Sequence, residues 1–146
     1  MAVQTQYNAT QAAAVAGAQA TMIPATIISR NVQGAPIGFG KPVAQGTADK
    51  SVVSFGGANT KFVGITLLDR SAAGENDTFR VGDSARVITK GDIWVVAAVT
   101  VAAGDPVFVT STGTLTNVGT DNTAITGARF DTSTTANGQL AVVRLG

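Results

Sequence analysis

Short apolar segments rich in β-branched residues alternate with Gly-containing turns over most of the chain. The densest example runs from residue 79 to 109, where Gly82-Asp83, Gly91-Asp92 and Gly104-Asp105 separate such segments. Gly adopts a positive φ without steric cost, and an Asp side chain accepts hydrogen bonds from nearby backbone amides, so each pair is expected to form a turn. Short strands joined by tight turns are typical of a β-sandwich or barrel.

The same pattern extends to both sides of this region. The apolar segment 93–101 has no polar face, so it should form a central strand covered on both sides. In the last segment, Ala141, Val143 and Leu145 share one face. Residues 34–42 and 69–77 are expected to be loops. Strands are expected at residues 22–29, 51–55, 62–68, 84–89, 93–101, 106–110, 114–116, 124–130 and 139–145.

The N-terminal region carries no charge before Arg30. Residues 9–22 look superficially like a signal peptide, but they lack a basic start and polar residues interrupt their apolar core, so no cleavage is expected. They are also too polar for a membrane span, which needs about 18 continuous apolar residues. Residues 1–21 therefore form either a disordered terminus or an extended arm that adds to the sheet edge of a neighbouring subunit.

Composition fits one β domain, residues 22–146, after this arm, because 146 residues are enough for a sizeable core. Charged residues are only 13% of the chain, against about 25% in typical domains. Small neutral side chains must then cover much of the surface. Such a surface suits contact with other proteins, but a monomer with few surface charges would have the same composition. The net charge is +1 and the Lys and Arg residues are scattered, so neither nucleic acid nor a membrane is expected as a direct partner.

The chain contains neither Cys nor His. Their absence removes disulfides, thiol nucleophiles, the Ser-His-Asp triad and most zinc sites. The segment 34–41 is Gly-rich and ends in Lys, but its spacing does not fit a phosphate-binding loop and no helix should follow it. Turn capping explains Asp83, Asp92 and Asp105 without a metal ion. We therefore predict no catalytic residue, no cofactor and no metal site.

The order and spacing of the segments is more telling than any one of them. The uncharged arm is followed by segments 27–29, 36–43, 62–65, 79–83, 91–95, 101–107, 127–130 and 138–145. Over nearly the whole chain this series resembles the small structural cement, or decoration, proteins of tailed-bacteriophage capsids. The resemblance implies an all-β fold, a jelly-roll-like sandwich or small barrel with an extended N-terminal arm.

The resemblance also implies a function. The protein would be a non-enzymatic homo-oligomer, a dimer or trimer, made in the host bacterial cytoplasm. On the virion it would bind the outer capsid surface, bridge neighbouring major capsid proteins and stabilise the expanded shell. The larger apolar groups of the N-terminal region, Tyr7, Val15, Met22 and Ile23, are the expected contacts with the capsid or with other subunits. The alternative is a carbohydrate- or receptor-binding β module on a virion or secreted, which would need more exposed aromatic residues than one Trp and one Tyr provide.

Overall fold

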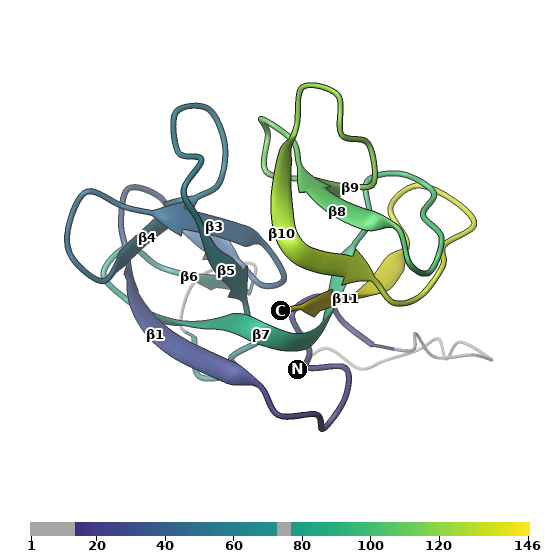
Figure 1. Ribbon diagram of the computed structural model, residues 1–146. Coiled ribbons are helices and arrows are strands. Elements are labelled where there is room, and N and C mark those ends of the chain that lie inside the picture. The colour runs from purple at the N-terminus through teal and green to yellow at the C-terminus, as the bar shows by residue number, and fades with distance from the viewer. Residues whose placement is uncertain (1–13, 73–76) are drawn as a thin grey trace, which may run out of the picture.

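The computed structural model describes residues 14–72 and 77–146, and all regular structure in these residues is β (Figure 1). The prediction of an all-β protein is confirmed. The strands are β1 (Thr26–Val32), β2 (Ile37–Gly38), β3 (Pro42–Gln45), β4 (Ser51–Ser54), β5 (Phe62–Thr66), β6 (Thr78–Phe79), β7 (Ser84–Val96), β8 (Pro106–Val109), β9 (Leu115–Thr116), β10 (Thr123–Phe130) and β11 (Leu140–Leu145).

Five of these strands close into a small barrel, in the order β1-β4-β3-β5-β7 and back to β1. The β1–β4 pair is parallel and the other pairs are antiparallel. Both β1 and β5 align with Ile88 of β7, one on each side. The small-barrel alternative of the fold prediction is thus the one that the structure shows.

The remaining strands extend the sheet beyond the barrel in the order β7-β11-β10-β8-β9. Figure 1 shows β7 crossing the lower part of the molecule, with β3, β4 and β5 above its first half, β1 running along its lower side and β8 to β11 above its second half. One apolar core joins the two parts, because the same buried cluster contains Ile65 and Ile88 of the barrel and Phe130 and Val143 of the extension. A second cluster around Val43 and Phe79 fills the other end of the barrel.

The prediction of a turn at Gly91-Asp92 is wrong. These residues lie inside β7, which continues for 13 residues without interruption. Gly91 has a φ of 128°, and a Cβ there would lie 2.8 Å from the Cβ of Ala25, so Gly permits an irregular strand backbone against a close neighbour. The other two pairs do form turns, capped by Asp83 and Asp105, which accept hydrogen bonds from the backbone amides of residues 80 and 102 at 2.8 and 2.9 Å.

Other differences lie at strand ends. The first strand begins at Thr26, and residues 22–25 precede it as an irregular segment. The strand expected over 93–101 ends at Val96, whose side chain is 40% exposed, so this segment is covered on one face and not on both. The expected loop 34–42 contains β2, because Ile37 pairs with Phe79. Ala141, Val143 and Leu145 share a buried face as predicted.

Candidate interaction surface

Residues 17–20 lie along β7 as a short antiparallel addition to its edge. The Gly17 amide donates to the carbonyl of Trp94 at 2.8 Å, and the Trp94 amide donates to that of Ala18 at 2.9 Å. The Ala20 amide donates to the carbonyl of Asp92 at 3.0 Å. Backbone pairing of this kind requires nothing of the side chains, which fits a neutral sequence. The last part of the predicted arm therefore lies on the sheet of its own chain.

Gly17 fixes where this segment docks. Its φ is 89°, and its carbonyl accepts a hydrogen bond from the Leu68 amide at 2.8 Å. A Cβ at this position would lie 2.7 Å from the Cβ of Phe39, closer than side-chain atoms approach. Only Gly therefore lets the chain pass between residues 39 and 68 and reach β7.

The predicted contact residues lie on both sides of the docked segment. Val15 precedes it and is 51% exposed, at the rim of a cavity of about 390 Å³ that Phe39 and Lys41 also line. Met22 and Ile23 follow it, with 100% and 36% of their surface exposed. Met22 and Ile23 are thus exposed just after the docked segment, and Val15 is exposed just before it. Tyr7 lies outside the described residues.

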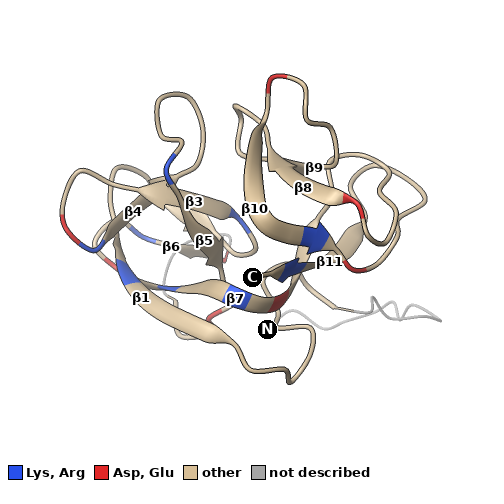
Figure 2. Ribbon diagram, viewed as in Figure 1, with Lys and Arg blue, Asp and Glu red and all other residues tan. Residues whose placement is uncertain are grey.

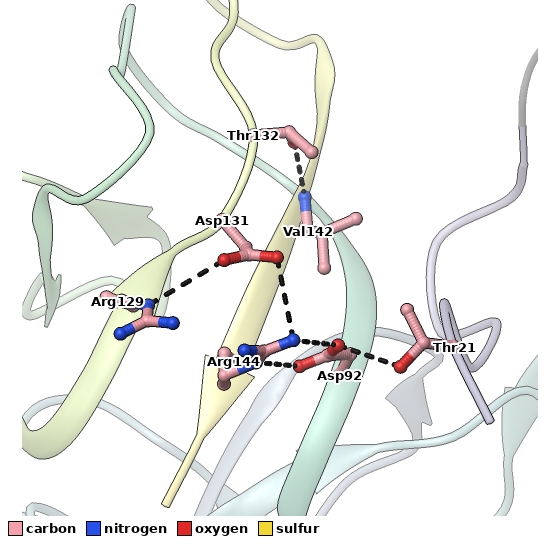
Figure 3. Close-up of polar contacts among 7 residues, drawn as sticks. All are labelled: Thr21, Asp92, Arg129, Asp131, Thr132, Val142 and Arg144. Atoms are coloured by element: carbon pink, nitrogen blue, oxygen red, sulfur yellow. Dashed lines mark hydrogen bonds and ion pairs between the residues drawn. The ribbon is translucent and has the colours of Figure 1, made fainter. Parts of the chain in front are cut away.

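A buried ion pair anchors the region where this segment ends (Figure 3). The carboxylate of Asp92 is fully buried, and Arg144 of β11 binds it through Nε and Nη2 at 2.8 and 2.9 Å. Thr21, directly after the docked residues, donates its hydroxyl to the same carboxylate at 2.8 Å. The hydrogen bonds from Arg144 lower the pKa of Asp92 more than burial raises it. The anchor therefore ties β7, β11 and the N-terminal segment together.

The ion pair continues outward to more exposed groups. Arg144 also lies 3.8 Å from a carboxylate oxygen of Asp131, and Arg129 lies 3.7 Å from the other oxygen (Figure 3). These distances exceed hydrogen-bond length, so the outer contacts are weak surface pairs.

The sequence reading missed this network because it assigned Asp92 to a turn. The available signal was an Asp next to the apolar run 93–96 and the single charged residue of the last strand, Arg144, each of which needs a partner if buried.

Little in the described residues points to bond-making chemistry. Within 14–72 and 77–146, no three His, Cys, Asp or Glu side chains gather as a metal site would require. No helix in these ranges has the length and hydropathy needed to cross a membrane. Charged residues lie scattered along the ribbon, as Figure 2 shows, and the exposed residues near the docked segment include the apolar Val15, Met22 and Ile23.

Comparison with known proteins decides the family. The family described as "Structural cement protein (E217 gp24/Pam3 gp6)", a phage cement family, matches residues 3–146. The chain belongs to this family. The resemblance read from the order of segments is confirmed, and the role of this phage cement protein is a structural one.

Solved structures show the same fold. A chain of "The capsid of Myoviridae Phage XM1" superposes on this cement protein with a TM-score of 0.80 at 17% sequence identity, and the match covers 100% of this chain and 98% of the other. "The crystal structure of head fiber gp8.5 N base in bacteriophage phi29" matches with a TM-score of 0.48 at 12% identity, over 84% and 95% of the two chains. No curated protein matches the sequence.

Proposed function

We propose that this cement protein binds the outer face of the expanded phage shell and bridges neighbouring major capsid proteins. Membership of the structural cement family over residues 3–146 is the observation that carries the proposal. A ligand that binds one state of a lattice and not another stabilises the bound state by mass action. A protein that binds only the expanded shell therefore opposes the rupture of that shell.

The N-terminal region supplies the contacts with the shell and with other subunits, through Tyr7, Val15, Met22 and Ile23. Three of these residues flank the segment docked on β7, so the sheet holds their backbone in place before binding. A preordered contact loses less conformational entropy when it binds. Apolar and small neutral groups are also removed from water at little cost, unlike charged ones.

Repetition over the shell makes weak contacts sufficient. An oligomer that touches several capsid proteins at once gains effective concentration for every contact after the first. The protein is made in the bacterial cytoplasm, where assembling shells are available, and remains on the outside of the virion.

A co-sedimentation experiment tests this proposal. Purified expanded shells lacking the protein are mixed with the full chain, and bound protein is measured after pelleting. We expect saturable binding, and at least a tenfold weaker affinity for the double variant Met22→Asp with Ile23→Asp. The control is Val81→Asp, which also adds charge at an exposed apolar residue, 54% exposed, on the turn before β7.

Both variants should keep the unfolding midpoint of the unaltered chain, because they change surface residues. Absence of binding by the unaltered chain would overturn the proposal. Equal loss in the control variant would show that the N-terminal region is not the contact.

A further inference from the structure

A groove lined by uncharged side chains lies where one edge of β7 passes from pairing with β5 to pairing with β11. On one edge, β7 pairs with β5 as far as Ile88 and with β11 from Gly91 onward. A groove of about 410 Å³ opens at this seam. Its walls come from β5, β7, β10 and the C-terminal end, and Figure 1 shows β5 and β10 facing each other above β7. Its neutral lining includes Phe62, Val63, Thr89, Ala124, Thr126 and Leu145.

An irregular stretch of β10, outside the aligned registers of its neighbours, borders this groove. β10 aligns with β8 at residues 123, 124 and 129, and with β11 at residues 129 and 130. In the described part of the chain, residues 125–128 therefore align with no strand on either side. β5 aligns with β7 only at Ile65 and Thr66. Gly64 still packs closely against the backbone of Ile88, so residues 62 and 63 are the part of β5 that borders the groove. Unpaired strand edges accept an added strand through backbone hydrogen bonds.

The N-terminal sequence contains a segment suited to such a site. Residues 3–8 read Val-Gln-Thr-Gln-Tyr-Asn, in which Val3, Thr5 and Tyr7 alternate with amide side chains. Alternation with period two and β-branched or aromatic residues on one face is typical of a half-buried strand. The segment is uncharged, and so are the side chains that line the groove, so no charged side chain would be buried on binding. We propose that residues 3–8 of a second copy of the chain bind in this groove as an added strand.

The position of the docked segment favours a second copy over the same chain. Residues 17–20 lie on the edge of β7 that also pairs with β1, whereas the groove opens on the opposite edge. The described chain thus begins on the side of β7 away from its own groove. Residue 8 is six residues from residue 14, about 20 Å in extended form, so the segment can reach the groove of a molecule that packs directly against this side of the domain. This self-association does not depend on the proposed binding to the shell.

Engineered disulfides test the proposal without any capsid, and the chain has no Cys of its own to interfere. Thr5→Cys is placed in one batch of protein, and Thr126→Cys, at an exposed groove residue, in a second batch with a size tag. The batches are mixed and oxidised, and products are separated on a non-reducing gel. We expect the mixed dimer to exceed by at least fivefold that formed when Val81→Cys replaces Thr126→Cys. Val81 lies near the opposite end of the barrel, roughly 20 Å or more along β7 from the groove.

Two further measurements separate the possible outcomes. Light scattering of the full chain should give an oligomer, and deletion of residues 2–13 should shift it to the monomer mass with the circular dichroism spectrum unchanged. A cross-link formed only within single chains carrying both Thr5→Cys and Thr126→Cys would overturn the proposal. A mixed dimer no more abundant than the Val81→Cys control would also overturn it.

Discussion

At the scale of single residues, the pair Asp92 and Arg144 carries the largest electrostatic consequence. Removing one member of a buried ion pair costs about 3–5 kcal/mol, because the other charge stays buried without a partner. Arg144 is 36% exposed, so water reaches part of the site and the lower end of this range applies. We expect Arg144→Ala to lower the free energy of unfolding by about 3 kcal/mol in urea titrations.

Arg129→Ala is the matched control for this variant. Arg129 lies 3.7 Å from Asp131, and the Arg129 side chain is 53% exposed. Removal of this side chain should therefore lower the free energy of unfolding by less than about 1 kcal/mol. Equal losses in the two variants would contradict a structural role for the buried pair.

The same pair predicts how stability depends on pH. Hydrogen bonds from Arg144, and a further one from Thr21, hold the pKa of Asp92 below its ordinary value in the folded protein. In the unfolded chain an Asp takes up its proton near pH 4 (pKa about 3.9), so below that pH the unfolded state binds more protons than the folded state. The stabilisation is therefore complete above about pH 5 and is lost as the pH falls toward the lower folded pKa. Urea titrations from pH 6 to pH 2.5 should show this fall, and Asp92→Asn should make it shallower.

Two glycines allow a matched test of backbone geometry. Both Gly91 and Gly82 have positive φ, at 128° and 90°. A Cβ at Gly91 would meet Ala25 and Ile88 at 2.8 and 3.0 Å, whereas a Cβ at Gly82 has nothing within 4 Å. Gly82→Ala should cost about 1 kcal/mol from backbone strain alone. Gly91→Ala should cost more, about 2–4 kcal/mol, because the close contact adds to that strain. Equal thermal unfolding midpoints for the two variants would show that the backbone at Gly91 shifts to accommodate the added Cβ at no extra cost.

At the scale of elements, the docked N-terminal segment behaves as an edge strand of β7. Residues 17–20 make four backbone hydrogen bonds to β7 and Leu68, and Thr21 adds one to Asp92. Each such bond contributes about 0.5–1.5 kcal/mol, part of which is offset by the entropy of ordering the segment. Deleting residues 2–21 should lower the free energy of unfolding by about 2–4 kcal/mol. Deleting residues 2–13 leaves all these hydrogen bonds in place and should change the free energy of unfolding little. A large decrease after this shorter deletion would contradict a stabilising role for residues 17–21.

Local sequence signals predicted the strands better than their connections. Strands such as β5, β10 and β11 combine β-branched residues with flanking turns, and both signals are local. The parallel pairing of β1 with β4 and the closure of the barrel depend on contacts between residues far apart in sequence, which no local pattern records.

Asp92 shows why part of the candidate surface could not be predicted. A Gly-Asp pair has the same local signature in a turn and in a strand, and only the distant Arg144 decides between them. Residues 17–20 have no strand signature either, because the edge of β7 and not their own side chains makes them extended. Met22 is fully exposed, so its side chain is accessible to a partner, and its role as a contact residue stays a prediction.

At the scale of the whole molecule, the proposed function predicts a more stable shell. A protein present at 100 times its dissociation constant stabilises each site by about 2.7 kcal/mol. Expanded shells saturated with the protein should therefore release their DNA at a higher temperature than undecorated shells, as measured by dye access to DNA during heating. Adding free protein should raise that temperature further until the sites are full. An unchanged release temperature would show that binding does not oppose rupture.

The continuous course of β7 through both parts of the sheet has a mechanical consequence. A pull between the barrel and the β8–β11 extension runs along one covalent strand, and the hydrogen bonds on its two edges bear that pull in shear. Sheared bonds must break together, whereas bonds across a hinge between separate sheets would open one after another. If the protein bridges capsid proteins as proposed, it would therefore resist stretching of the lattice by internal pressure as a rigid connection and not as a hinge.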